Sequence, residues 1–85
     1  EECFFWRTHS GAELDLLVVH GRRRFGFEIK RTSAPLVTPS MRSAMADLRL
    51  DSLRVVHAGG HSFPMDRHIR AVAFGDLLRE VRSLD

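Results

Sequence analysis

The chain has 85 residues, of which 44% are hydrophobic, so we expect one small domain with a real core and not a disordered segment. It contains no apolar run of about 18 residues and no secretory signal pattern, which predicts a cytoplasmic protein that does not enter a membrane. A single cysteine excludes an internal disulfide and a thiolate zinc site. Strand-like sequence follows the first residues almost at once, so residues 1–85 are interpreted as one domain taken from a longer chain.

The formal net charge of +2 is unevenly distributed along the chain. Residues 20–54 hold eight basic and three acidic side chains, whereas the remainder holds five basic and eight acidic ones. A positive central stretch can contact nucleic-acid phosphates, and the candidate contacts are Arg22, Arg23, Arg24 and Arg31. Ordinary solvated surfaces explain the same pattern equally well.

Three strands are predicted in the first third of the chain: Cys3–Thr8, Ala12–Val19 and Arg24–Lys30. An antiparallel pairing of the second and third, with Val19 opposite Arg24, places their apolar residues in opposed pairs on one buried face. A shift of one residue would turn this apolar set into water, so the pattern resists such a shift. The opposed pairs are Leu14 with Ile29, Leu16 with Phe27, and Val18 with Phe25.

The same register places Asp15 opposite Glu28, and Glu13 opposite Lys30, on the other face. Directly opposed side chains lie about 5 Å apart at Cβ, so the two carboxylates should repel unless a cation lies between them. Carboxylate oxygens are preferred ligands of Mg²⁺ and Mn²⁺, which polarise a phosphoryl oxygen and lower the pKa of a bound water. We therefore expect the three carboxylates to hold Mg²⁺ or Mn²⁺, and Lys30 to orient the attacking water or stabilise charge on the phosphate.

A helix is predicted to follow the third strand. Thr38 is a good N-cap and Pro39 suits the first helical position. An apolar stripe then recurs at helical spacing, at Met41, Ala44, Met45 and Leu48. Because this helix connects Arg24–Lys30 to a buried-type strand at Leu53–Ala58, those two strands should be parallel, with a right-handed crossover.

The last part of the chain predicts a loop over residues 61–67, a strand at Ile69–Phe74, and a closing helix that Asp76 caps and that runs through Val81. The whole order is three strands, a helix, two strands and a helix. This order predicts an α/β domain built around a mixed sheet.

The sequence Gly-Ala-Glu-Leu-Asp at residues 11–15, a hairpin, Glu28-Ile29-Lys30 and a helix together resemble the core of PD-(D/E)XK nucleases. The flanking Phe-Trp-Arg-Thr at residues 5–8 and Arg-Thr at residues 31–32 are similar to the C-terminal domain of unknown function of many bacterial and archaeal predicted AAA+ ATPases. This resemblance spans about residues 4–81. It implies a restriction-endonuclease-like α/β core without the superfamily's first helix, a Mg²⁺ or Mn²⁺ cofactor, an ATPase domain in the same chain, and the catalytic residues Asp15, Glu28 and Lys30.

Three functions stay open at this point. The first is a nuclease-like domain that binds nucleic acid or hydrolyses its phosphodiester bonds with a metal. The second is a non-catalytic module that docks on its ATPase or on a partner protein, and the third is a plain DNA-binding domain that uses the basic middle. Metal binding separates the first from the others, and salt-dependent DNA binding separates the third from the second. The aromatic start and the missing helix also predict a homodimer that covers the bare sheet face.

Overall fold

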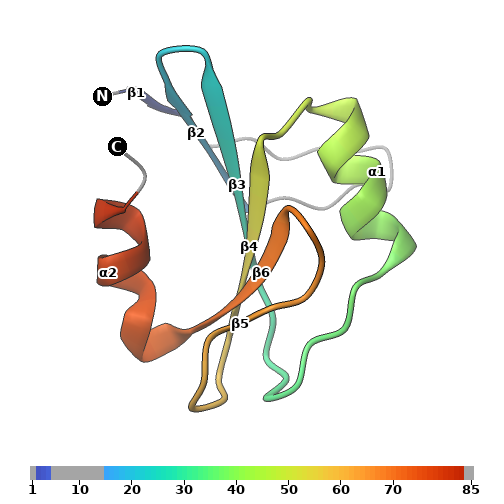
Figure 1. Ribbon diagram of the computed structural model, residues 1–85, viewed down its shortest axis with the longest axis vertical. Coiled ribbons are helices and arrows are strands. Elements are labelled where there is room, and N and C mark those ends of the chain that lie inside the picture. Colours follow the sequence, from blue (N-terminus) through green and yellow to red (C-terminus); the bar gives the residue numbers. More distant parts are fainter. Residues whose placement is uncertain (1, 5–14, 84–85) are drawn as a thin grey trace.

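The structure is a computed structural model that describes residues 2–4, by their backbone alone, and residues 15–83. In this part of the chain six strands form one mixed sheet, in the order β1-β2-β3-β4-β6-β5 (Figure 1). Helices α1 and α2 lie on opposite sides of this sheet, which gives three layers. The bounds are β1 Glu2–Phe4, β2 Leu16–His20, β3 Arg23–Ile29, α1 Pro39–Asp47, β4 Ser52–His57, β5 Phe63–Pro64, β6 Ile69–Ala73 and α2 Leu77–Arg82.

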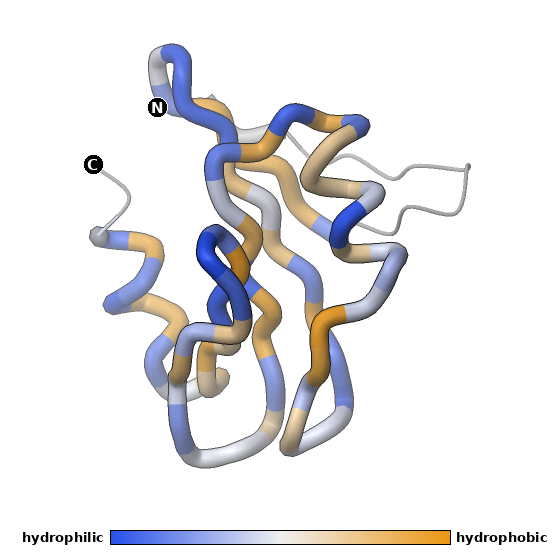
Figure 2. The backbone as a smooth tube through the Cα atoms, turned by 45° about the vertical axis from the view of Figure 1, so that its right-hand side comes forward, coloured by the Kyte–Doolittle hydropathy of each residue, from blue (hydrophilic) through white to orange (hydrophobic). Residues whose placement is uncertain are grey.

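Strands β2 and β3 form the predicted hairpin in the predicted register. Val19 pairs with Arg24, and the pairs Val18 with Phe25 and Leu16 with Phe27 follow in step. The hydrophilic tip of this hairpin is visible in Figure 2. Its turn includes Gly21 at φ 63°, a left-handed conformation that glycine adopts without steric penalty. The alternation of apolar residues therefore determined the register, although the predicted strand residues 5–8 and 12–14, with Glu13 and Leu14, lie outside the described residues.

The sheet is apolar on both faces, which corrects the expectation of one apolar and one polar face on β2 and β3. On the side of α2, Phe25, Phe27 and Val56 form a buried cluster. Leu17, only 3% exposed, points to the opposite side and packs in a second cluster beneath α1. The physical reason is that one helix lies on each face of the sheet, so the strands between the helices are buried on both sides. The second cluster comprises Leu17, Met41, Leu48, Leu50, Leu53, Val55 and Ile69.

Helix α1 begins as its sequence predicts. The Met41 N–H donates to Thr38 Oγ1 at 3.2 Å, which satisfies one amide of the first turn, and Pro39 is the first helical residue. Its predicted stripe faces the sheet, with Met41 and Ala44 fully buried. As expected for a helical crossover, β4 then lies parallel to β3, and β6 lies parallel to β4.

The end of the chain departs from the prediction in two details. The predicted loop over residues 61–67 contains β5, which pairs antiparallel with β6. Asp76 is the N-cap residue of α2, as predicted, but its side chain makes no capping bond, and Oδ2 accepts from Ser62 Oγ at 2.7 Å. A 3-10 turn at Phe74–Asp76 precedes the helix. Among the residues described, no helix is both long enough and apolar enough to cross a membrane.

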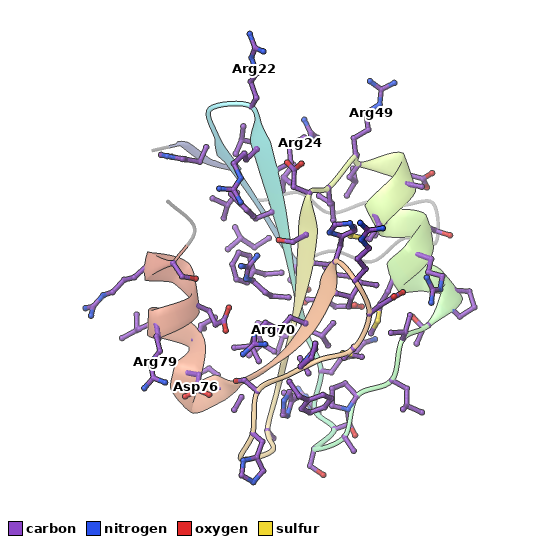
Figure 3. The ribbon with its side chains drawn as sticks, in the orientation of Figure 1. Arg22, Arg24, Arg49, Arg70, Asp76 and Arg79 are labelled. Carbon is purple, nitrogen blue, oxygen red and sulfur yellow. The ribbon has the colours of Figure 1, made fainter. Side chains whose placement is uncertain are left out.

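Two kinds of contact hold α2 to the sheet. Leu77 packs against the cluster around Phe25 and Phe27. Glu80 binds two strands at once: its Oε2 lies 3.2 Å from Arg54 Nε on β4, and its Oε1 lies 2.9 Å from Arg70 Nε on β6. Arg70 lies between the sheet and α2 in Figure 3. One carboxylate therefore fixes the helix across two neighbouring strands.

Candidate functional site

Asp15 is positioned by backbone contacts with β3. Its own N–H donates to the Phe27 carbonyl at 3.1 Å, and the Ile29 N–H donates to Asp15 Oδ2 at 2.7 Å. The second bond is short and charge-assisted, so it fixes the carboxylate beside the peptide that joins Glu28 to Ile29. The Asp15 side chain remains exposed to solvent.

Glu28 and Lys30 form the second part of the site. They are two residues apart across the end of β3, so their side chains point to the same face of the sheet, the one that α1 covers. Lys30 Nζ lies 3.2 Å from Glu28 Oε1. The Glu28 side chain is 4% exposed and that of Lys30 is 35% exposed, so the lysine is the solvent-facing member of the pair. It places a positive charge beside the Glu28 carboxylate.

The structure thus brings Asp15, Glu28 and Lys30 to one end of the β2–β3 hairpin. The fourth predicted member, Glu13, lies outside the described residues. Within residues 15–83 there is no group of three or more His, Cys, Asp and Glu side chains that could hold a metal. Two carboxylates nevertheless suit Mg²⁺, which is usually held by one or two of them and keeps several water ligands. The Ile29 carbonyl, between the two motif residues, is a further candidate oxygen ligand.

His57 is a neighbour of this site that the sequence pattern did not reveal. It ends β4, next to the point where the Lys30 N–H donates to the Val56 carbonyl at 2.8 Å. Its ring is 1% exposed, and Nδ1 accepts from the Gly59 N–H at 3.0 Å. Nε2 is buried and has no hydrogen-bond partner among the described residues. The available signal was its place at the carboxyl end of a parallel strand, where functional side chains gather in α/β sheets.

The predicted nucleic-acid contacts do not form one patch. Arg22 lies at the hairpin tip, labelled in Figure 3, and Arg31 follows the other end of β3. The strand between them is about 20 Å long at 3.3 Å per residue. The Arg23 guanidinium lies 4.9 Å from the centre of the Phe25 ring, a cation–π contact. Arg24 is used in the fold, because its Nε donates to the Leu48 carbonyl at 2.7 Å. Only Arg31 lies near the acidic site.

Comparison with known proteins gives a family match and two relatives. Residues 1–77 match the family model described as "Domain of unknown function (DUF4143)". An uncharacterized protein of Mycobacterium bovis and one of Mycobacterium tuberculosis are each 48% identical to this chain over 75 residues. The alignments cover 88% of the chain but only 17% of each relative. No solved structure matches the chain.

Proposed function

Since the chain belongs to the family described as Domain of unknown function (DUF4143), whose description assigns no activity, we propose a function from its own site. The domain is a nuclease-like domain that binds Mg²⁺ or Mn²⁺ between Asp15 and Glu28 and hydrolyses phosphodiester bonds of a nucleic acid. In the full-length protein it is attached to an ATPase, as the sequence resemblance implies.

One observation carries this proposal: the 2.7 Å hydrogen bond from the Ile29 N–H to Asp15 Oδ2. Through it the Asp15 carboxylate lies beside the Glu28-Ile29-Lys30 segment, although the two motifs are a hairpin apart in sequence. Three strands in antiparallel succession, followed by a helix and a parallel strand, also agree with a PD-(D/E)XK core. Sequence resemblance and geometry thus support the same residues.

Asp15, Glu28 and the Ile29 carbonyl would hold the ion. When bound, the ion polarises a phosphoryl oxygen and makes a bound water more acidic. Lys30 has a different task. Its side chain is 35% exposed, so the ammonium can reach a phosphate at the surface and stabilise the negative charge that develops there. Arg31, exposed and next in sequence, can bind a neighbouring phosphate of the same strand.

Thermal melts with and without millimolar Mn²⁺ test the metal site. An ion present at ten times its dissociation constant stabilises the fold by about 1.4 kcal/mol, which raises Tm by roughly 6–11 °C in a domain this small. Asp15→Asn should remove this shift, while its amide oxygen can still accept from the Ile29 N–H. Asp47→Asn is the matched control, because Asp47 is an exposed residue of α1, and it should keep the full shift. Equal melting temperatures in all samples would refute metal binding at this site.

Cleavage is tested separately, with a fluorescently labelled oligonucleotide and Mn²⁺. Lys30→Ala should retain most of the Mn²⁺-dependent Tm shift but lose cleavage, because the lysine acts on charge that appears only in the transition state. A wild-type protein that shows the Tm shift but no cleavage of single- or double-stranded substrates would contradict the nuclease activity and leave only the metal site.

A further inference from the structure

Helix α2 and the turn before it carry an apolar stripe on their outer side. Phe74, Leu78 and Val81 follow each other at i, i+4 and i+7, and their exposed fractions are 69%, 72% and 46%. This stripe does not hold α2 in place, because Leu77 and Glu80 make the contacts to the sheet. Large apolar side chains left in water in a continuous row mark a surface that binds another molecule.

A pocket extends this surface onto the end of the sheet. Its volume is about 240 Å³, and Phe74 forms one of its walls, so the stripe and the pocket are continuous. Ile29, which is 61% exposed, and Val56 supply further apolar walls. A pocket beside a helical stripe is the arrangement that accepts the apolar side chains of an amphipathic helix.

The rim of this surface is positively charged. Arg79 is 86% exposed, and Arg31 and Arg82 are exposed as well. Of the acidic groups on α2, the Glu80 side chain is only 14% exposed and is paired with two arginines of the sheet. Asp76 accepts a hydrogen bond from Ser62 and forms a long ion pair of 3.9 Å with Arg79, which lies beside it at the start of α2 in Figure 3. The partner should therefore carry acidic residues beside its apolar face.

We propose that the surface formed by Ile29, Phe74, Leu78 and Val81 docks an acidic, amphipathic segment of the same polypeptide, outside residues 1–85. A second copy of the domain fits poorly, because a two-fold pairing of α2 helices would bring Arg79 and Arg82 against their own counterparts. The aligned relatives are far longer than the matched region, which covers 17% of each. A covalently attached segment also has a high effective concentration, so it binds even when its intrinsic affinity is modest. The surface includes neither Asp15 nor Glu28, but Lys30 and Arg31 of the proposed nuclease site line the same pocket. The labelling test below reads the cover of α2 alone, so its outcome does not depend on metal binding.

Thiol labelling of the full-length protein tests this docking. In a background with native cysteines replaced by serine, Leu78→Cys is treated with a maleimide, and Ser43→Cys, an exposed position of α1, serves as the matched control. We expect Leu78→Cys to be labelled at least tenfold more slowly than Ser43→Cys, at a rate that does not depend on protein concentration. The double charge reversal Arg79→Glu and Arg82→Glu should raise the labelling rate of Leu78→Cys to that of Ser43→Cys, since the acidic segment would then be repelled.

Three results would overturn the proposal. Equal labelling rates at positions 78 and 43 would show that the α2 surface is not covered by the rest of the polypeptide. Protection that weakens on dilution would show that a second molecule covers it, and an increase in molecular mass by light scattering would identify a second copy. Protection that survives the double charge reversal would contradict an acidic partner segment.

Discussion

Glu80→Ala should be among the most destabilising single changes on α2. The Glu80 carboxylate bridges Arg54 and Arg70, and both it and Arg54 have side chains that are only 14% exposed. Removing one partner of a fully buried ion pair destabilises by about 3–5 kcal/mol, because the other charge remains buried without compensation. Here Arg70 is 43% exposed and regains water, so we expect a smaller loss, about 2–3 kcal/mol.

The loss can be measured by urea unfolding followed by circular dichroism, or as a fall in Tm of roughly 10–20 °C for a domain of this size. Glu80→Gln keeps one oxygen acceptor and nearly the same shape, so it should cost about 1–2 kcal/mol. Arg79→Ala is the control on the same helix: its ion pair with Asp76 spans 3.9 Å and its side chain is 86% exposed, so the change should stay within about 0.5 kcal/mol. If Glu80→Ala were no more destabilising than Arg79→Ala, the bridge would not be what holds α2 to the sheet.

Two further predictions concern the loops. Gly59→Ala should destabilise the fold by about 1–3 kcal/mol, because its Cβ would lie 2.5 Å from the Ser33 carbonyl oxygen. Gly60→Ala is the control and should be nearly neutral, because a Cβ there would have nothing within 4 Å. Equal midpoints of urea unfolding for the two variants would contradict this prediction. The Arg67 N–H and then Arg42 lower the pKa of Asp66. That carboxylate therefore stabilises the fold above the ordinary Asp pKa of about 4, and the contribution is lost as the pH falls through its lowered value. As the pH falls from 5 to 2, the Tm of the wild type should decrease further than the Tm of Asp66→Asn. Parallel profiles of Tm against pH would refute a stabilising role of the Asp66 carboxylate.

Local sequence patterns determined the elements and one register. The alternation around Val18 and Phe25 has a period of two, so a one-residue slip would turn the whole apolar set outward, and the sequence alone excluded that slip. Thr38 and Pro39 act on amides within one turn of themselves, so the start of α1 was equally predictable. The pairing of Glu28 with Lys30 was also predictable, since residues two positions apart in a strand point to the same face.

Only the tertiary structure decided which residues are buried by other elements and which side chains pair across the fold. Leu17 is buried because α1 covers its face of the sheet, and the short apolar run at residues 16–19 does not by itself say which element provides that cover. Glu80 meets Arg54 from 26 positions away, and Asp76 binds Ser62 in place of its own helix, because side chains take the partners that packing offers them.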